Sequence, residues 1–553
     1  MTNTQKNKKN HNTHNTNNYD LVIIGGGISG IYTLYKLSSK YPQLKILLLE
    51  SGERYGGRIY SYKETIDGEE YVMDLGAGRL GHHHKLINNL INELGLKPKI
   101  VDIPNTKTYI EISENNKVHN KTHVKDTIMT KLYNFFLSPL VSKLGKSALQ
   151  KFYLSELIKK YVSLSFFQKV ESVFEYSSDL NEFNAYDAIE YFKHDYNNET
   201  KFFTLYGGLE QIIENMLDLI KKTKSYKSKN ITLLNLSNVE NITKINNNLY
   251  KIVVNNYNKS KVYNVYSNYV ICAIPKQSLE KFDLFKPILR DLNSINSINL
   301  LRIFEIYNKT NEEVWFKNIE KTITNSEVQF VIPINPNNGL IMSSYSDCAN
   351  ARFWNLLRAK KGIQFVKNKL NIKLNQLFSI YNIKVPPSKY IKMYFWDAGV
   401  ACWKKNVDSD NLSSKLLNPC PNVFIIGENY SKYQAWCEGA LMTSENCISK
   451  LTNTLITSKA LKHTRKLGGK KGEYNKKMFT LDEVKKHNTK KDAWTIIENK
   501  VYNISSWIPK HPGGEIILQA LGKDATQLFL TNGHPSYVKK TILPKYYIGN
   551  LKI

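Results

Sequence analysis

Two sets of residues, one near each end of the chain, have types and spacing that could carry chemistry. Gly25, Gly27 and Gly30 follow a short apolar run in G-x-G-x-x-G spacing. Glycines in this pattern let backbone N–H groups approach a pyrophosphate at the start of a helix. Near the other end, His511 begins the sequence HPGG, and His534 follows in the pair GH. Imidazole side chains take part in several kinds of chemistry, and the role of these two depends on the segment that contains them.

The elements around the glycines agree with a nucleotide cradle. Leu21–Ile24 predicts a buried parallel strand, Ile31–Leu37 predicts a helix, and Lys45–Leu49 predicts a second strand that ends on Glu50. An acidic residue about 20 positions after the glycines can accept hydrogen bonds from a ribose. The competing interpretation is a glycine-rich structural turn. The predicted cofactor-binding residues of the cradle are Gly25, Gly27, Ser29, Gly30 and Glu50.

Two longer motifs indicate which dinucleotide is bound. The segment Glu50–Arg58 reads E-x-x-x-R-x-G-G-R, and Val423–Cys447 reads VFIIGENYSKYQAWCEGALMTSENC. Both segments resemble motifs of the flavin amine oxidase family, and they occur in the family's order. The resemblance implies FAD in a two-domain fold, with the FAD domain built from segments near 20–100, 230–275 and 415–455.

Further cofactor contacts are implied by the same resemblance. Cys402 stands roughly where monoamine oxidases tether FAD through sulfur, so a covalent and a non-covalent link both stay open. Arg302 stands where the family often places a Lys near the reactive flavin nitrogen. Because Arg does not give up a proton in proteins, its expected role is to organise water or charge. The remaining implied FAD contacts are Arg58, Val239, Glu428, Gly439 and Ala440.

The substrate site is implied by a narrower resemblance. Arg79, in the stretch DLGAGRL, is similar to the Arg of L-amino-acid oxidases that binds the substrate carboxylate. The planar guanidinium suits that task because it can donate two parallel hydrogen bonds to a carboxylate. A structural ion pair is the alternative for Arg79. Tyr345 is the expected second carboxylate partner, and Trp396 and Trp436 are the expected aromatic walls, with core packing as their alternative.

The C-terminal segment Phe479–Leu551 resembles cytochrome b5 from end to end. The sequences FTLDEV, AWTIIENKVYNISSW, HPGG, GKDAT, GH and YYIG occur in that family's order. The resemblance implies a bound haem b with His511 and His534 as its two axial ligands. Two histidines leave no open position on the iron, which favours electron transfer over oxygen activation.

The chain divides into four predicted parts. These are a polar tail at 1–18, a body of mixed helices and strands at 19–455, a basic linker at 456–477 and a compact module at 478–553. The predicted fold class is an α/β Rossmann-type FAD-binding domain with an α+β substrate domain, followed by a small α+β cytochrome b5-like domain.

Charge and cysteine content limit the classes of partner and compartment. The chain has 77 Lys and Arg against 48 Asp and Glu, a net charge of +29, which by itself favours an anionic partner such as nucleic acid. The lysines are widely spread and no nucleic-acid motif occurs, so biased composition explains the charge and no specific nucleic-acid partner is expected. No apolar run reaches the roughly 18 residues of a membrane span. The six cysteines form no C-x-x-C pair, which favours a reducing compartment. We expect a cytoplasmic protein, or one packaged in a virion if the source is a large virus.

The combined prediction is an FAD-dependent oxidoreductase that oxidises a small amine or amino acid. The cofactor carries such chemistry, and O₂ or a redox protein is the expected acceptor, with the haem module serving electron transfer. Two alternatives stay open. The same fold could act on a polyamine, carotenoid or porphyrinogen, or the body could be a degenerate flavin fold with a structural role, for example in a virion. The oligomeric state is not predicted.

Overall fold

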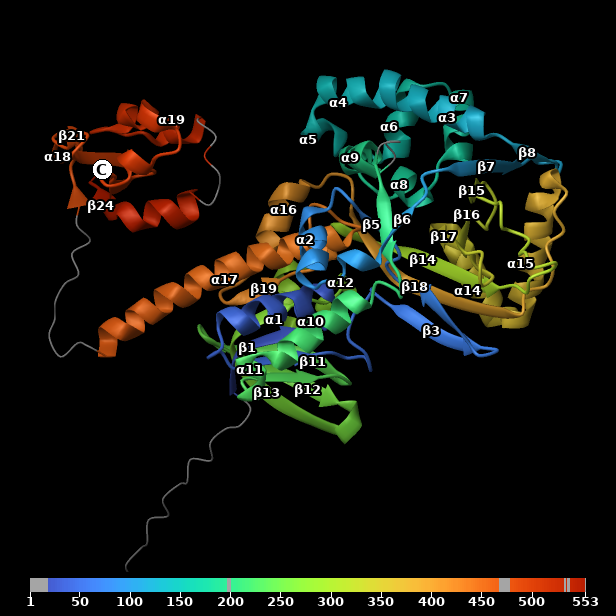
Figure 1. Ribbon diagram of the computed structural model, residues 1–553, viewed down its shortest axis with the longest axis horizontal. Helices are drawn as coiled ribbons and strands as arrows, with labels where there is room; N and C mark the ends of the chain where they lie inside the picture. Colours follow the sequence, from blue (N-terminus) through green and yellow to red (C-terminus); the bar gives the residue numbers. More distant parts are fainter. Residues whose placement is uncertain (1–17, 196–199, 467–477, 532–533, 535–537, 553) are drawn as a thin grey trace, which may run out of the picture. The chain divides into compact units, whose positions relative to one another are not determined.

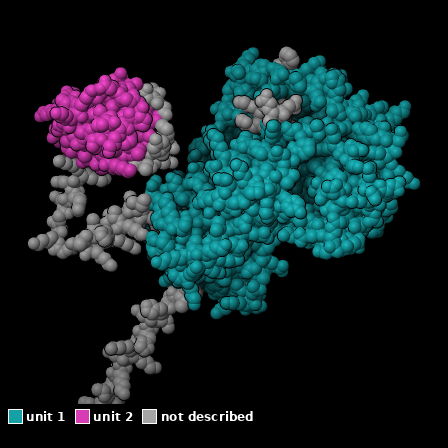
Figure 2. Space-filling view, in the orientation of Figure 1, with its two compact units in different colours: residues 1–454 teal, residues 455–553 magenta. Residues whose placement is uncertain are grey.

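The computed structural model describes residues 18–195, 200–466, 478–531, 534 and 538–552. Of the predicted polar tail, residues 1–17 lie outside the described residues. The chain forms two compact units, residues 1–454 and residues 455–553 (Figure 2). The larger unit contains two large sheets and a group of helices, and the smaller unit contains one sheet with short helices (Figure 1).

The first large sheet contains the predicted nucleotide cradle. Its strand order is β10-β2-β1-β13-β12-β11, and β19 pairs with β13. The pairs among β10, β2, β1, β13 and β19 are parallel, and β12 runs antiparallel to both of its neighbours. The bounds are β1 Asn18–Ile24, β2 Ile46–Leu49, β10 Ile231–Leu234, β11 Ser237–Asn246, β12 Leu249–Asn256, β13 Lys261–Cys272 and β19 Val423–Ile425. Every strand therefore falls within or directly beside the three segments expected to build an FAD domain.

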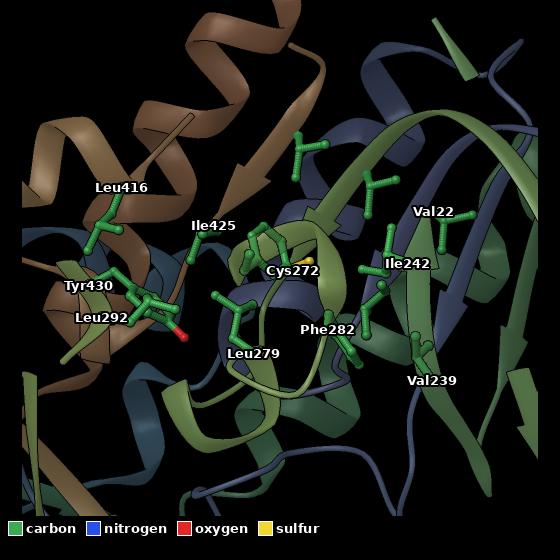
Figure 3. Close-up of a cluster of buried hydrophobic side chains, with 14 of the residues drawn as sticks. Val22, Val239, Ile242, Cys272, Leu279, Phe282, Leu292, Leu416, Ile425 and Tyr430 are labelled. Carbon is green, nitrogen blue, oxygen red and sulfur yellow. The ribbon is translucent and has the colours of Figure 1, made fainter. Parts of the chain in front are cut away.

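The core of this domain is apolar on the inner face of the sheet. Val22 of β1 and Cys272 of β13 are fully buried, and they belong to one cluster with Ile242, Leu279 and Phe282 (Figure 3). Burying such side chains contributes roughly 1.5–3 kcal/mol each. The associated helices are α1 Ile28–Lys40, α2 Lys85–Glu93, α10 Gln211–Lys222, α11 Lys224–Lys227, α12 Lys276–Leu279, α13 Leu289–Leu292 and α16 Ser409–Leu416. Helix α1 packs against α10 and begins directly after the glycine turn.

The second large sheet forms the other half of the larger unit. Its order is β18-β14-β17-β16-β15-β7-β8, antiparallel except for the parallel pair β15 and β7. The bounds are β7 Lys107–Ile112, β8 Val118–Asn120, β14 Ile295–Ile306, β15 Lys321–Thr324, β16 Phe330–Asn335, β17 Leu340–Asp347 and β18 Tyr390–Trp403. Helices α14 (Cys348–Lys361) and α15 (Ile363–Phe378) pack beside it. Arg302 of β14 is paired with Tyr345 of β17 and with Tyr394 of β18. The register of the sheet thus places two predicted site residues, Arg302 and Tyr345, side by side.

A helical region and two small sheets complete the larger unit. The helices are α3 Thr122–Lys131, α4 Ser138–Leu144, α5 Lys146–Leu149, α6 Leu154–Tyr161, α7 Leu164–Val173, α8 Ser177–Asn181 and α9 Ala185–Asp195. The small sheets are the hairpin β3 Ser61–Ile66 with β4 Glu69–Asp74, and the set β5 Leu80–Gly81, β9 Phe202–Leu205 and β6 Ile100–Ile103. The helices share an apolar cluster with Trp436 and Cys402, so they close one side of the unit over the second sheet.

The smaller unit is an α+β module. Its sheet order is β20-β24-β23-β22-β21. Thr480 and Glu483 form a reciprocal capping box at the start of α18, which satisfies backbone N–H groups that a helix start leaves without partners. The bounds are β20 Met478–Phe479, α18 Leu481–Lys485, β21 Asn488–Thr489, β22 Asp492–Ile497, β23 Lys500–Asn503, α19 Thr526–Thr531 and β24 Tyr547–Leu551.

Helix α17 differs from the predicted boundary between body and linker. It spans Cys437–Lys466, so the first part of the segment predicted as a linker at 456–477 is helical. No Gly or Pro interrupts the sequence between Gly439 and Gly468, which removes the residues that most strongly end helices. Residues 467–477 lie outside the described residues. Among the helices of the described residues, none combines the length and the apolar character needed to cross a bilayer.

Candidate functional site

A single large cavity in the larger unit brings most of the predicted site residues together. Its volume is about 1150 Å³, and both large sheets contribute to its wall. The predicted cofactor residues that border it are Gly25, Gly27, Ser29, Glu50, Arg58, Val239, Glu428 and Ala440. The predicted substrate residues that border it are Arg79, Arg302, Tyr345, Trp396 and Trp436. Gly30, Gly439 and Cys402 do not border it.

Two glycines of the cradle are required by close backbone packing. Gly25 has φ +103°, and a Cβ atom there would lie 2.4 Å from the carbonyl oxygen of Ala273 in the neighbouring strand connection. A Cβ at Gly30 would lie 2.0 Å from the Gly25 oxygen. Gly27 is different, because its nearest contact would be an ordinary 3.8 Å to Gly57. Gly25 and Gly30 therefore let strand and helix meet, whereas Gly27 keeps space open where the backbone faces the cavity.

Glu50 is held in place by backbone N–H groups at the end of β2. Gly26 donates to its Oε2 at 2.7 Å, and Gly52 donates to its Oε1 at 2.8 Å. Ser51 Oγ also donates to Oε1, at 3.4 Å. A carboxylate has about four acceptor positions, so one remains, on Oε2, for a hydroxyl group of a ligand. The position and the remaining capacity of Glu50 fit a ribose.

Glu428 connects three segments beside the cavity. Its Oε2 accepts from Arg58 Nη1 at 2.6 Å, and its Oε1 accepts from the backbone N–H groups of Ala401 and Ala435 at 2.9 and 2.7 Å. Arg58 also donates to the Gly399 carbonyl at 3.1 Å. The ion pair between Arg58 and Glu428 connects the segment after β2, the end of β18 and the loop before α17. These three segments therefore border the cavity together.

The start of α17 approaches the start of α1. A Cβ at Gly439 would lie 1.6 Å from the Tyr433 carbonyl oxygen, so only glycine permits this contact. Ser29 Oγ donates to the Ala440 carbonyl at 3.4 Å, and Ser444 Oγ donates to the Ser29 carbonyl at 3.3 Å. The cavity thus extends from the glycine cradle to the beginning of a second helix. An elongated dinucleotide fits this arrangement of glycines, backbone N–H groups and paired charges.

Arg302, on strand β14, borders the same cavity. It is 9% exposed, its Nη1 donates to the Asp74 carbonyl at 2.6 Å, and its guanidinium lies 4.8 Å from the centre of the Tyr345 ring. A Cβ at Gly78 would lie 2.5 Å from Arg302 Nη1, so the loop around Gly78 must stay free of side chains there. Burial raises the pKa of the Asp74 carboxyl above its usual range, with opposing hydrogen bonds from Ser61 and Leu209.

Aromatic side chains form part of the cavity wall. Trp396 donates from Nε1 to the Leu75 carbonyl at 2.7 Å, and its ring lies 4.8 Å from that of Tyr394. Trp436 stacks on Phe202 with ring centres 5.6 Å apart and planes 7° apart. Arg79 lies against this second pair, with its guanidinium 4.6 Å from the Phe202 ring and 5.4 Å from the Trp436 ring. Tyr394 and Phe202 were not predicted, although the spacing of Tyr394 two residues before Trp396 places both on one face of a strand.

The expected sulfur tether at Cys402 is not supported by the position of its side chain. Cys402 has no exposed surface, belongs to the apolar cluster of the helical region, and donates from Sγ to the Glu182 carbonyl at 3.3 Å. Burial raises the pKa of its thiol well above the usual range, which disfavours the reactive thiolate. Val400, two residues earlier, borders the cavity instead.

The three consecutive histidines His82, His83 and His84 differ in their surroundings. His82 and His83 lie in an exposed turn, but His84 is 1% exposed and its ring lies 4.7 Å from that of Trp436. Its Nδ1 accepts from the Gly81 N–H at 3.0 Å, and its Nε2 lies 3.1 Å from the Tyr433 hydroxyl. Burial, together with the positive charges of His83 and Arg79, lowers the pKa of His84 to about 3. His84 is therefore neutral and supports the wall formed by Trp436.

Lys321 is a cavity residue that sequence reasoning missed. It is the first residue of β15 and borders the cavity, and its Nζ lies 3.6 Å from Glu175 Oε2. Nothing in the sequence near Lys321 distinguishes it from the many other lysines of the chain.

In the smaller unit, His511 and His534 face each other as an axial ligand pair would. Their ring centres are 6.1 Å apart. Two metal–imidazole bonds of about 2 Å each, together with the ring radii, span a similar distance. His511 Nδ1 lies 3.2 Å from the Gly514 carbonyl and His534 Nδ1 lies 2.9 Å from the Phe529 carbonyl. These acceptors engage the Nδ1 atoms and leave each Nε2 for a metal, as second-shell carbonyls do in metalloproteins.

Comparison with protein families agrees with both sites. The family model described as flavin containing amine oxidoreductase matches residues 28–447. The model described as cytochrome b5-like heme/steroid binding domain matches residues 480–552. The first match covers more than half of the chain, and the two matches do not overlap.

Two curated relatives match a short stretch of the chain. An acyl-lipid (8-3)-desaturase of Physcomitrium patens is 46% identical over 101 residues, which are 18% of this chain and 21% of the desaturase. A cytochrome b5 of Oryza sativa subsp. japonica is 47% identical over 78 residues, which are 14% of this chain and 56% of that protein. The matched stretch thus spans from about a fifth to about half of these relatives.

Solved structures align with the larger part of the chain. A putrescine oxidase mutant from a redesign of cofactor binding superimposes with a TM-score of 0.60 at 15% identity, covering 79% of this chain and 99% of that chain. The wild-type putrescine oxidase bound to putrescine gives a TM-score of 0.59 at 14% identity with the same coverage. At such low identity these structures show a common fold.

Proposed function

The chain belongs to the flavin-containing amine oxidoreductase family, carries a cytochrome b5-like domain at residues 480–552, and we propose that it oxidises an α-amino acid whose carboxylate binds Arg79. The families imply FAD and haem, and the residues present fit both groups. FAD would occupy the large cavity, and haem would bind between His511 and His534. The protein is therefore an FAD-dependent oxidoreductase, and the proposal concerns its substrate and electron acceptor.

The observation that carries the substrate proposal is the position of Arg79. It borders the cavity beside the stacked rings of Phe202 and Trp436. A guanidinium at an aromatic wall can donate in-plane hydrogen bonds to a carboxylate while its face stays packed on the rings. The amine-bearing carbon of the same substrate would then be directed toward Tyr394 and Trp396.

The residues of the chain would bind and orient the substrate. A bound FAD supplies the acceptor for the hydride lost from the carbon beside the substrate nitrogen, which leaves an imine that water converts to a keto acid and ammonia. Trp396 and Trp436 would restrict that carbon and exclude water. Arg302 stays charged at any working pH and is held by the Asp74 carbonyl, so it can stabilise negative charge and cannot act as a base.

We further infer that electrons pass to the haem module of the same chain. A haem held by His511 and His534 would have no open position for O₂, which suits a one-electron carrier. Two haem turnovers, or one haem and a second acceptor, would remove the two electrons from each substrate. The support for this transfer is the presence of both redox modules in one chain.

The substrate proposal is tested by replacing Arg79. The variant Arg79→Met is compared with Arg290→Met, which alters an exposed Arg away from the cavity. Each FAD-loaded protein is assayed with a series of L-amino acids and with the decarboxylated amine of each. Arg79→Met removes the charged pair between the guanidinium and the substrate carboxylate. This should lower kcat/KM for amino acids by roughly 10- to 100-fold, with little change for the amines. Equal effects on both series, or turnover of diamines alone by the wild type, would refute the proposal.

A further inference from the structure

We propose that the substrate is an acidic amino acid, and that Lys321 binds its side-chain carboxylate. This inference rests on the proposed function, in which Arg79 takes the α-carboxylate. It adds a second cationic position to the same cavity and names a narrower class of substrate. The argument comes from a buried group of four charged residues that adjoins the cavity wall.

The four residues contain more positive than negative charge. Glu175 is 4% exposed, and its Oε1 accepts hydrogen bonds from Lys107 Nζ at 2.8 Å and Lys125 Nζ at 2.7 Å. Lys321 Nζ lies 3.6 Å from the other oxygen, beyond ordinary hydrogen-bond distance. One carboxylate therefore stands among three ammonium groups. Buried charges that lack a full set of counter-ions are costly, so a ligand that supplies negative charge is favoured.

Lys321 is the member of this group that a ligand can reach. It borders the cavity, whereas Glu175, Lys107 and Lys125 do not. Its side chain is 20% exposed, and its Nζ lies 4.9 Å from the ring centre of Phe330. Among the described residues, Glu175 is the only carboxylate within 4 Å of Lys321 Nζ. Glu175 already holds two closer lysines, so the ammonium of Lys321 keeps hydrogen-bonding capacity for a ligand.

Three other carboxylates that border the cavity have partners of their own. Asp102 lies 2.7 Å from His82 Nε2, and Glu320 accepts from Thr108 at 3.3 Å. Asp74 accepts from Ser61 and from the Leu209 N–H.

Lys321 and Arg79 border the same cavity. Lys321 Nζ lies 4.9 Å from the centre of the Phe330 ring, and that ring stacks on Tyr345 of the cavity wall with ring centres 5.7 Å apart. Burial is the main cause that lowers the pKa of Lys321 to about 7, and Glu175 opposes this shift. Two cations in one cavity match a ligand with two carboxylates better than a ligand with one.

A structural role alone is the alternative for Lys321, as a third partner of Glu175. Lys107 provides the matched control, because it belongs to the same charged group and does not border the cavity. Replacing Lys107 removes one charge of the group and leaves the cavity wall intact. Replacing Lys321 removes the charge that a ligand would contact.

The test compares acidic amino acids with their neutral amides. Full-length, FAD-loaded wild type, Lys321→Met, Lys321→Arg and Lys107→Met are titrated anaerobically with L-glutamate, L-glutamine, L-aspartate and L-asparagine by calorimetry, and flavin bleaching is recorded separately. The wild type and Lys107→Met should bind the acid at least tenfold more tightly than the amide. Lys321→Met should lose this preference through weaker binding of the acid, and Lys321→Arg should keep most of it.

Each result decides between the two proposals. If the wild type does not prefer the acids, or if Lys321→Met keeps the preference, the role of Lys321 is refuted. If neutral amino acids bleach the flavin in that case, the proposed oxidation of amino acids still stands. If acids bind through Lys321 but no amino acid bleaches the flavin, the ligand class is supported and the proposed reaction is refuted. Failure of all four compounds to bind refutes the inference.

Discussion

The residues that hold the cavity together are few and strongly coupled. Glu428 accepts hydrogen bonds from Arg58, from Asn429 and from two backbone N–H groups of different segments. Replacing one partner of a largely buried pair leaves the other charge without compensation, which costs more than the pair gains over an apolar substitute. Glu428 is thus a residue where a small change should have a large effect on cofactor binding.

The first prediction concerns Glu428→Gln. The variant keeps the shape of the side chain but leaves Arg58 without its counter-ion, so FAD affinity should fall roughly tenfold or more. The measurement is a fluorescence titration of the apoprotein with FAD. Glu445→Gln is the control, because Glu445 lies on α17, pairs with Tyr32 and does not border the cavity. An unchanged FAD affinity in Glu428→Gln would contradict this role of the ion pair.

The second prediction concerns the pH dependence of binding at Lys321. Its ammonium loses the proton as the pH rises through about 7, since burial and the charges of Arg79, Lys107 and Lys125 outweigh the effect of Glu175. The affinity for L-glutamate relative to L-glutamine should therefore fall as the pH rises, by roughly tenfold between pH 6.5 and 8.5. Calorimetric titrations across this range provide the measurement, and a constant ratio would count against the assignment.

The third prediction concerns acid stability and His84. Its pKa is lowered to about 3 in the folded state, so the unfolded chain takes up the proton first as the pH falls below 6.5. Stability is therefore lost between pH 6.5 and 3. Between pH 7 and 4.5 the wild type should lose about 2–3 kcal/mol more than His84→Gln. Denaturant unfolding at both pH values measures this difference. His119→Gln changes an exposed histidine and should behave as the wild type does; an equal loss in His84→Gln would disprove the burial argument.

At the scale of elements, the turn from β1 to α1 separates two uses of glycine. Gly30 meets the backbone of Gly25, whereas Gly27 opens toward the cavity. The G-x-G-x-x-G spacing predicts both glycines equally, and only the structure assigns a different cause to each. Gly439, near the start of α17, is required for the same reason as Gly30, because a Cβ there would collide with the carbonyl oxygen of Tyr433.

The fourth prediction follows from that difference. Gly30→Ala should destabilise the apoprotein by roughly 3 kcal/mol or more, because the backbone must move to accept a Cβ. Gly27→Ala should leave apoprotein stability within about 1 kcal/mol of the wild type and should weaken FAD binding, because its Cβ would project toward the cofactor. Thermal unfolding of the apoproteins and FAD titrations measure both effects. A stable Gly30→Ala protein with weak FAD binding would show that the assignment is reversed.

Local sequence signals accounted for much of the architecture and for the cofactor end of the cavity. The cradle, Glu50, Arg58 and Glu428 lie in short motifs whose residues are close in the chain, and the histidine pair has its own module. The substrate end depends on strand register and on contacts between distant segments. The prediction for Cys402 was wrong because its side chain lies in the apolar cluster of the helical region, whereas Val400, two residues earlier, borders the cavity. His84 and Lys321 were missed because their burial comes from Trp436, Glu175 and Phe330, which lie far away in the sequence.

At the scale of the whole molecule, two redox modules share one chain. In the proposed reaction the amine oxidoreductase part would supply two electrons for each substrate molecule, and a haem with two histidine ligands would accept one at a time. Whether the haem is the acceptor is therefore a question of kinetics, and it can be measured directly.

The decisive measurement is anaerobic stopped-flow mixing of the full-length, FAD- and haem-loaded protein with an L-amino acid, recorded at the flavin and haem absorption bands. The account predicts flavin bleaching that depends on Arg79, followed by haem reduction whose rate is independent of protein concentration, as expected within one chain. His534→Ala should retain the flavin phase and lose the haem phase. Absence of flavin bleaching with every amino acid would contradict the proposed reaction, and bleaching without haem reduction would contradict the transfer between modules.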